Sequence, residues 1–391
     1  MVRNQSLAIV EAQRASVDAA GTHVHLSFGR IVDALAKHFR QTYLCVPLIR
    51  GNRLGTHDYR LTTDRIRLIP QPVYGSMMTA LPHVIAITRA YLKTARAADI
   101  IFVRGLIPFV AHLYAAAWLY RRPTCHWIVG NPVELLKTHR RTNVLVDSFS
   151  ACYARLDRVC TRWGRWLTGG AFICNGEELG RTFRSPRTLV AVSSTITDDE
   201  FYERPDTCTD ATIELLFIGF PRPEKGLQYL IEALPRLKLK RPWRLTIVGA
   251  SEPHGHYQQQ LVHLAEQRGV SDRIRWVGYV TYGPDMFVYL RQADILILPT
   301  LSEGTPRVLV EARANSLPII ATNVGGIPTS VTDGHDGLLV PPKDPDAIAR
   351  AIERIVEDGE LRRSLIRNGL QTARGLTVER FVERILRVLE E

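Results

Sequence analysis

Two glutamates in one short stretch could act on a sugar or a ribose. The stretch SEGTPRVLVEARANSLPIIAT carries Glu303 and Glu311 eight positions apart, across a predicted loop-to-helix junction. We expect Thr305 to cap this helix and Pro306 to take its first position, where a missing N–H costs nothing. The free N–H groups of a first helical turn, with the positive end of the helix dipole, form an anion site. A carboxylate beside such an anion site can contribute to binding only by accepting hydrogen bonds from neutral hydroxyls of the ligand. For this stretch alone, two solvated surface glutamates are the simpler interpretation.

Two further turns have residue types suited to phosphate. The turn GFPRPEKG contains Arg222 and Lys225, and two cations at a helix start could neutralise a diphosphate. The turn NVGGIP contains Gly325 and Gly326, which permit close approach of the backbone to a ligand. Taken singly, a solvated basic turn and a tight turn before a helix are equally good interpretations.

All three turns follow predicted buried strands of the second half of the chain. We expect strands at 214–220, 244–250, 273–280, 294–300, 318–323 and 337–342. We expect helices at 226–237, 256–269, 306–315 and 344–358. Nearly continuous apolar strands that alternate with amphipathic helices predict a parallel sheet covered on both faces, so residues 211–376 form one doubly wound α/β domain.

The first half repeats this pattern more loosely and predicts a second Rossmann-like domain over residues 1–200. Its strands are expected at 6–12, 42–49, 99–105, 125–130, 171–175 and 188–194, with helices near 27–39 and 109–120. The polar stretch 197–210 has no periodicity and is interpreted as the interdomain linker. The amphipathic tail 377–391 either ends the second domain or crosses back to the first. Ligands of such sheets bind outside the carboxyl ends of the strands, so we expect the site between two facing halves.

Composition indicates a soluble globular protein. The chain has 391 residues, of which 46% are hydrophobic, and its longest apolar stretch, 105–120, is interrupted by Pro108 and His112. That stretch is shorter than the roughly 20 residues that span a bilayer. No cationic and apolar pattern opens the chain, so we expect no signal peptide. The six cysteines show no CxxC spacing, which favours reduced thiols in a cytoplasmic protein.

The net charge of +11 lies entirely in the first half. Residues 1–206 hold 27 Lys and Arg against 16 Asp and Glu, whereas residues 207–391 hold 23 of each. This asymmetry indicates a negatively charged partner, either an anionic membrane surface or an acidic substrate. In the segment 153–167, four arginines at helical spacing accompany Trp163 and Trp166. Membrane docking, packing of the basic face on its own tryptophans, and binding of an acidic acceptor all stay open. We expect no nucleic-acid partner, because none of the usual modules occurs.

The motifs of the second half, taken together, resemble those of a known family. SEGTPRVLVEARANSLPIIATNVGGIP is similar to the signature of the family 4 retaining glycosyltransferases of GT-B fold: a Glu, seven residues, a second Glu, a Pro-containing strand and a Gly-Gly turn. PEKGLQYLIEAL, LTIVGA, WVGYV, QADILILPTLSEG and DGHDGLLVPPKDPDAIARAI resemble other blocks of that family, in the same order. The resemblance covers about residues 213–358, and over the first half it is one of topology only.

The resemblance assigns roles to single positions. Glu303 matches the glutamate that meets hydroxyls of the donor sugar, Glu311 the one that holds the ribose hydroxyls, and Lys225 the diphosphate-binding lysine. The turn that cradles the distal phosphate matches Gly304, Thr305, Arg307 and Val308, and further donor positions are Gly219, Gly325 and Gly326. Weaker matches on the acceptor or phosphate-loop side are Gly21, Thr22, His23, Gly130 and Asn131.

Three positions depart from the family pattern. The family usually has Arg directly after Gly219, where this chain has Phe220, and Arg222 is the expected substitute. Thr329 stands where the family has Glu, and Gly130 where a His often ends the strand. These departures motivate one alternative to transfer, a GT-B binding subunit without transfer activity. A nucleotide-sugar epimerase is a further alternative; it requires acid/base side chains that face the sugar, of which Glu303 is the one evident candidate.

The implied function is transfer of a sugar from a nucleotide-diphosphate sugar to an acceptor hydroxyl, with retention of configuration. Lys225, Arg222 and the helix start would stabilise the leaving phosphate without a metal or other cofactor. The acceptor would attack from the leaving-group face with the phosphate oxygen as base, so no protein nucleophile is required. A glycan or lipid-linked acceptor, in polysaccharide, glycolipid or other glycoconjugate synthesis, would place the protein in the cytoplasm or at the inner face of the membrane. The DPD at 344–346 resembles a metal-binding Asp-x-Asp, but its place before a helix favours capping.

Overall fold

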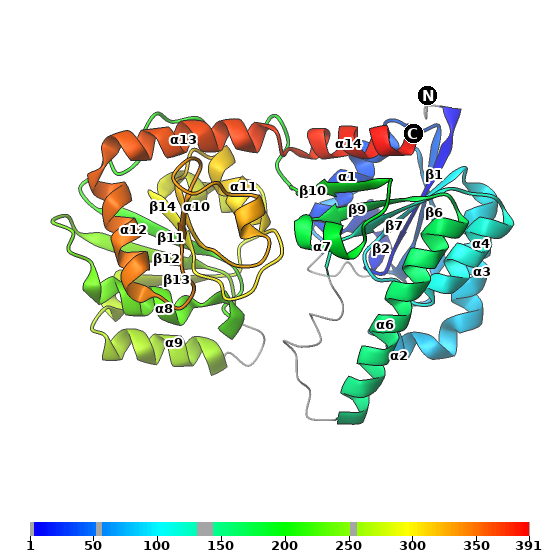
Figure 1. Cartoon of the computed structure of the whole chain (residues 1–391), viewed down its shortest axis with the longest axis horizontal. Coiled ribbons are helices and arrows are strands. Elements are labelled where there is room, and N and C mark those ends of the chain that lie inside the picture. Colours follow the sequence, from blue (N-terminus) through cyan, green and yellow to red (C-terminus); the bar gives the residue numbers. More distant parts are fainter. Residues whose placement is uncertain (1–3, 52–56, 131–143, 251–255, 391) are drawn as a thin grey trace. The chain divides into compact units, whose positions relative to one another are not determined.

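The chain forms two compact units, each with its own sheet (Figure 1). The structure is a computed structural model and describes residues 4–51, 57–130, 144–250 and 256–390. Unit 1 comprises Met1–Ala191 and Val378–Glu391, and unit 2 comprises Val192–Thr377. Within the described residues, no helix is both long enough and apolar enough to cross a membrane.

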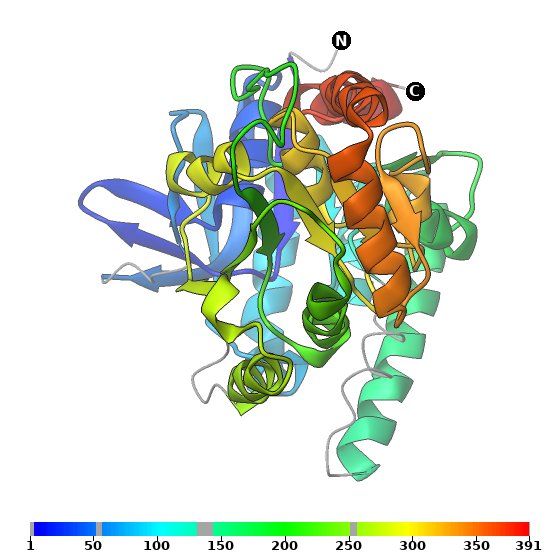
Figure 2. The same cartoon turned by 90° about the vertical axis from the view of Figure 1, so that its left-hand side faces the viewer.

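Unit 2 is a doubly wound domain with six parallel strands in the order β13-β12-β11-β14-β15-β16. The strands are β11 (Ile213–Ile218), β12 (Trp243–Val248), β13 (Ile274–Gly278), β14 (Ile295–Leu298), β15 (Ile319–Thr322) and β16 (Leu338–Val340). The helices are α8 (Leu227–Ala233), α9 (His256–Gln267), α10 (Pro284–Gln292), α11 (Arg307–Ala314), α12 (Pro345–Glu357) and α13 (Gly359–Arg374). Short 3-10 turns are η3 (Pro223–Lys225), η4 (Leu234–Arg236), η5 (Ser271–Arg273) and η6 (Ile327–Thr329). Figures 1 and 2 show helices on both faces of this sheet, which explains why its central strands are almost continuously apolar.

The strand order of unit 2 places three loops beside one another. β11 pairs with β12 on one side and β14 on the other, and β14 pairs with β15. From β11 the next strands of the chain, β12 and β13, are added on one side, and β14, β15 and β16 are added on the other. The strand order therefore reverses between β11 and β14, and ligands of open parallel sheets bind at such a switch point. The loops that follow β11, β14 and β15 are those with the sequence-predicted cationic, acidic and Gly-Gly turns.

Unit 1 contains a larger mixed sheet in the order β10-β9-β8-β7-β1-β4-β2-β3-β5, with β6 also paired to β4. Its strands are β1 (Ser6–Glu11), β2 (Ala15–Asp18), β3 (Gly21–Val24), β4 (Gln41–Arg50), β5 (Tyr59–Arg60), β6 (Ile66–Gln71), β7 (Ile100–Arg104), β8 (Thr124–Ile128), β9 (Ala171–Asn175) and β10 (Thr188–Ala191). Its helices are α1 (Leu26–Ala36), α2 (Met77–Ala80), η2 (Leu81–His83), α3 (Val84–Ala97), α4 (Val110–Leu119), α6 (Val144–Leu167), α7 (Glu177–Thr182) and α14 (Val378–Glu390). The tail helix α14 belongs to this unit, where Phe381 packs on Trp127 with ring centroids 5.0 Å apart.

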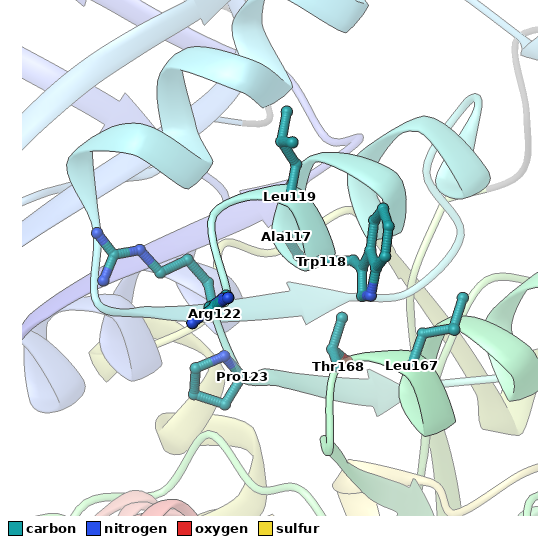
Figure 3. Close-up of a pocket in the computed structure, with 8 residues that line it drawn as sticks. Ala117, Trp118, Leu119, Arg122, Pro123, Leu167 and Thr168 are labelled. Carbon is teal, nitrogen blue, oxygen red and sulfur yellow. The ribbon is translucent and has the colours of Figure 1, made fainter.

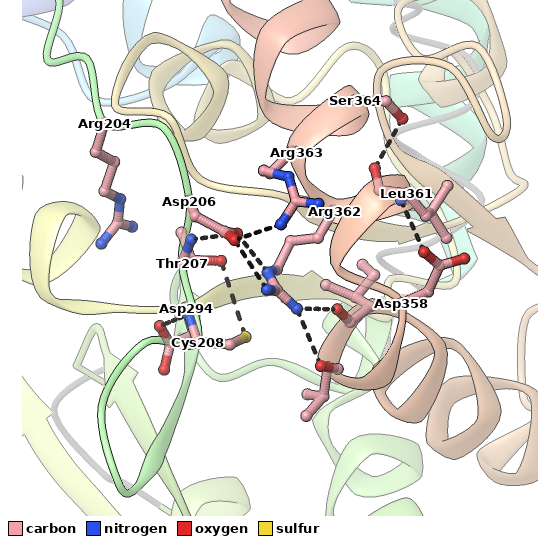
Figure 4. A network of polar contacts seen from close by, with 12 residues as sticks. Arg204, Asp206, Thr207, Cys208, Asp294, Asp358, Leu361, Arg362, Arg363 and Ser364 are labelled. Carbon is pink, nitrogen blue, oxygen red and sulfur yellow. Dashed lines mark hydrogen bonds and ion pairs between the residues drawn. The ribbon is translucent and has the colours of Figure 1, made fainter.

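The segment at 197–210 is fixed to unit 2 by polar contacts, although its sequence has no periodicity. The guanidinium of Arg362 donates to both carboxylate oxygens of Asp206, at 2.6 and 3.0 Å, as Figure 4 shows. The backbone N–H of Cys208 donates to Asp294, at 2.5 Å, and the Arg204 N–H donates to Ser316. Hydrogen bonds to side chains therefore hold in place a segment for which the hydrophobic pattern predicts neither a helix nor a strand.

Candidate functional site

The loops after β11 and β14 are joined by hydrogen bonds at the switch point of unit 2. The carbonyl of Glu224 accepts from the N–H of Leu301 at 2.7 Å and from the hydroxyl of Thr300 at 2.9 Å. Gly226 has a φ of +67°, and a Cβ there would lie 2.0 Å from the carbonyl oxygen of Pro299. The glycine thus permits a close approach that fixes one loop against the other.

Lys225 and Glu303 form an ion pair across these two loops. The ammonium of Lys225 contacts Oε2 of Glu303, although the residues are 78 positions apart in sequence. Their side chains are only 23% and 19% exposed, so solvent screens the pair less than it would on an open surface. An ammonium has three N–H donors, so Lys225 can bind a further acceptor while it holds Glu303. The structure thus brings together two residues that the sequence singles out.

The Gly-Gly turn after β15 lies against the backbone of the Glu303 loop. Gly325 has a φ of +54°, and a Cβ there would lie 1.9 Å from the carbonyl oxygen of Glu303. A Cβ on Gly326 would lie 2.3 Å from the carbonyl oxygen of Gly304, and the Gly326 N–H donates to Glu303 at 3.2 Å. The two glycines therefore position the Glu303 loop, a role that the sequence pattern did not identify.

Helix α11 begins one residue later than expected. Pro306 is extended, with φ −72° and ψ 122°, and no side chain caps the helix, so the capping assignment of Thr305 is wrong. The Thr305 side chain turns inward instead, where it is 7% exposed and its hydroxyl has no hydrogen-bond partner among the described residues. Helix geometry leaves the N–H groups of Arg307 and Val308 without an intrahelical acceptor. Gly304, just before them, is exposed, so this helix start presents donors where an anion can bind.

Glu311 lies within α11 and is held by a residue that sequence reasoning missed. Its carboxylate accepts from the hydroxyl of Thr195 at 2.5 Å, and both side chains are buried. Its backbone carbonyl accepts from the side-chain amide of Asn315 at 2.9 Å. Thr195 precedes the first strand of unit 2, in a polar run with no recognisable signal, and only the folded chain brings it to α11.

Arg222 lies over the ring of Phe220, with its guanidinium carbon 5.8 Å from the ring centroid. Phe220 is 49% exposed and follows Gly219, whose φ of +155° favours glycine. The aromatic ring that replaces the family's usual arginine therefore stacks with the nearest alternative cation.

The acceptor-side residues are placed differently from the sequence expectation. Gly21, Thr22 and His23 do not form the loop after the first strand, because they lie in β3 of a β2–β3 hairpin. His23 is buried there with its Nε2 3.1 Å from Asp18. The loop that does follow β1 borders a hollow of about 430 Å³, whose lining includes Gln13, Arg14, His25, His57, Tyr74 and Ser76. Gly130 follows β8, and Asn131 lies outside the described residues.

Part of the chain is similar to known glycosyltransferases. Residues 202–372 match the family model described as glycosyl transferases group 1. The D-inositol 3-phosphate glycosyltransferase of Salinispora tropica is 33% identical over 181 residues, which cover 45% of this chain and 37% of that protein. The glycogen synthase of Mycobacterium tuberculosis is 33% identical over 217 residues, which cover 54% and 46%. The match thus spans less than half the length of these curated relatives.

The crystal structure of Anabaena HepE in complex with UDP shares the fold of the whole chain. The two superpose with a TM-score of 0.73 over 99% of each chain, at 16% sequence identity. The prediction of an α/β protein with two Rossmann-like domains of the GT-B type is thereby confirmed.

Proposed function

We propose that this chain, whose residues 202–372 match the family model of the glycosyl transferases group 1, moves a sugar from a nucleotide-diphosphate donor to an acceptor hydroxyl. The observation that carries the proposal is the Lys225–Glu303 pair beside the start of α11. A cation, a carboxylate and free helical N–H groups at one switch point suit a molecule with both phosphates and hydroxyls. The UDP in the HepE crystals supports a nucleotide-sugar donor for this chain.

Each group of the site has a distinct role in the proposed reaction. Breaking a sugar–diphosphate bond develops negative charge on the leaving phosphate. Lys225 and the N–H groups of Arg307 and Val308 would stabilise that charge. Glu303 would accept hydrogen bonds from the sugar, oriented by its contact with Lys225. Glu311, held by Thr195, would accept from the ribose hydroxyls.

We further propose that transfer retains the anomeric configuration and needs no metal. The acceptor would attack from the leaving-group face and give its proton to the departing phosphate oxygen, so neither glutamate has to serve as nucleophile. The two-carboxylate scheme of glycosidases does not apply, because Glu303 and Glu311 have different partners. A glycan or lipid-linked acceptor would bind unit 1, and the enzyme would work in the cytoplasm at an anionic membrane surface, in glycoconjugate synthesis.

The test begins with the donor. A panel of nucleotide sugars is screened by thermal shift, because a ligand that binds only the folded state raises Tm. Hydrolysis and transfer of the best donor are then measured for the wild type, Glu303→Ala and Lys225→Ala. We expect each variant to keep its Tm without ligand and to lose at least about a hundredfold in rate. Lys240→Ala and Glu357→Ala, at exposed positions of unit 2, are the matched controls.

The outcomes separate the candidate functions. Normal turnover by Glu303→Ala and Lys225→Ala would refute the assigned site. A wild type that binds the donor but neither hydrolyses nor transfers it would be a binding subunit, and a changed sugar on an intact nucleotide would indicate an epimerase. NMR of the product gives its anomeric configuration, and a chelator that abolished turnover would contradict the metal-free mechanism.

A further inference from the structure

Helix α6 of unit 1 presents an apolar stripe to the outside. Trp163 and Trp166 are 63% and 65% exposed, and their rings form an edge-to-face pair with centroids 6.0 Å apart. The stripe continues at helical spacing through two further exposed residues, Leu156 and Val159, and ends at Leu167. Residues three, four and seven apart share one face of a helix, so these side chains form a continuous surface.

The opposite face of α6 buries small or polar side chains, among them Ala154. Asp157 and Thr161 are buried, at 8% and 1% exposure, and Oδ1 of Asp157 and Oγ1 of Thr161 have no hydrogen-bond partner among the described residues. Gly164 packs so closely on Tyr114 that a Cβ would lie 2.1 Å from its ring. A helix at a water-exposed surface normally buries its large apolar side chains. On α6 this arrangement is reversed, which indicates that the outer stripe is covered in the working protein.

The apolar surface extends from α6 to the neighbouring helix α4. Trp118, Leu119 and Tyr120, at the end of α4, are all exposed. Figure 3 shows Trp118 and Leu119 with Leu167 around one hollow of about 520 Å³, so the carboxyl ends of the two helices contribute to one surface. We call this surface the α4–α6 face. Exposed apolar areas of this extent mark sites of protein or membrane contact.

The charges around the α4–α6 face are almost all positive. Residues 110–123 and 151–170 contain six arginines and a single acidic residue, the buried Asp157. One of the six, Arg122, is paired with Asp99 at 3.4 Å. The arginines are Arg121, Arg122, Arg155, Arg158, Arg162 and Arg165. Arginines beside exposed tryptophans match the layered chemistry of an anionic bilayer surface, where phosphates lie above the apolar chains.

We infer that the α4–α6 face docks onto an anionic lipid bilayer, with Trp163, Trp166 and Trp118 inserted at the level of the headgroups. This inference specifies the membrane association proposed above and is independent of sugar transfer. A second copy of the chain fits the face less well, because a two-fold contact would bring arginines against arginines.

Vesicle sedimentation with the full chain tests the docking. We expect binding to vesicles of phosphatidylcholine and phosphatidylglycerol in a three-to-one ratio, little binding to pure phosphatidylcholine, and weakening by salt. Trp163→Ala/Trp166→Ala and Arg155→Glu/Arg162→Glu should each weaken binding at least about tenfold while Tm is unchanged. Arg350→Glu/Arg354→Glu, exposed on α12 of unit 2, is the charge-matched control and should bind within about twofold of the wild type. Quenching of tryptophan fluorescence by brominated lipid should decrease in the tryptophan variant.

Several results would overturn the inference. These are wild-type protein that stays in solution with both kinds of vesicle, α6 variants that bind as tightly as the wild type, or a dimer that only the tryptophan variant breaks. Donor hydrolysis in solution, measured on the same samples, keeps the two proposals apart. A wild type that binds vesicles but neither hydrolyses nor transfers any donor would leave the docking intact and refute transfer. A wild type that transfers sugar but binds neither kind of vesicle would refute the docking alone.

Discussion

Replacement of Asp157 by asparagine should stabilise unit 1, and the gain should depend on pH. The carboxylate lies on the inner face of α6, and burial raises its pKa from 3.8 to about 7. Below the unfolded pKa both states hold the proton, so the folded state has no disadvantage. As pH rises toward 7 the unfolded state ionises while the folded state stays protonated, and folding becomes less favourable. Above pH 7 the folded state contains an ionised buried carboxylate and the loss is complete.

The magnitude follows from the size of the pKa shift. Three units at about 1.4 kcal/mol each correspond to a destabilisation of about 4 kcal/mol at neutral pH and above. Asparagine has nearly the same shape and no charge. The free energy of unfolding of Asp157→Asn should therefore exceed that of the wild type by up to about 4 kcal/mol near pH 8, and the difference should vanish near pH 4. Buried His126, whose pKa burial lowers to about 4, contributes the opposite pH dependence, but it is present in both proteins and cancels in the difference.

Urea unfolding followed by tryptophan fluorescence measures this difference across the pH range. Four of the six tryptophans, Trp118, Trp127, Trp163 and Trp166, lie in unit 1, so its transition dominates the signal. Asp64→Asn, at an exposed position of the same unit, is the control and should show no comparable pH-dependent gain. If Asp157→Asn were no more stable than the wild type at pH 8, the carboxylate would have a stabilising partner and the reasoning would be wrong.

Two further substitutions test the packing around the candidate site. Gly326→Ala should push the Gly-Gly turn away from Gly304 and raise the donor KM about tenfold or more. Gly375→Ala, with a φ of −80° and an added Cβ that meets only the Thr372 carbonyl oxygen at 3.4 Å, is the control and should leave the KM unchanged. An unchanged KM for Gly326→Ala would show that the close approach is not required. Asp336→Asn should destabilise unit 2 by about 3 to 5 kcal/mol, because it leaves the buried guanidinium of Arg313, 2.7 Å away, without its counter-charge. Urea unfolding measures this loss, and a change below about 1 kcal/mol would mean that the guanidinium is stabilised by its carbonyl acceptors alone.

Local sequence patterns were sufficient to predict the sheet of unit 2 and the turns that carry the candidate residues. Buried strands that alternate with amphipathic helices have a periodicity that depends only on neighbouring residues, so β11, β14 and β15 could be located without tertiary information. The start of α11 was misplaced by one residue, because the burial of the Thr305 side chain depends on tertiary packing that the local sequence does not show. The hairpin of β2 and β3 was also missed, since its pairing with β4 and β5 joins strands from separate parts of the chain.

The sequence by itself determined which residue types follow each strand, and the tertiary structure decided which of them meet. Lys225 and Glu303 touch because β11 and β14 are neighbours, and strand order is set by the packing of the whole sheet. Thr195 reaches Glu311 across 116 positions for the same reason. The helical spacing of the arginines in α6 was visible in the sequence, but it did not show which face of the helix is buried. In the structure the small side chains, with Gly164 close against Tyr114, face the interior of unit 1 and the tryptophans face outward. Tertiary packing makes this choice, because a neighbouring element can approach a helix closely only where its side chains are small.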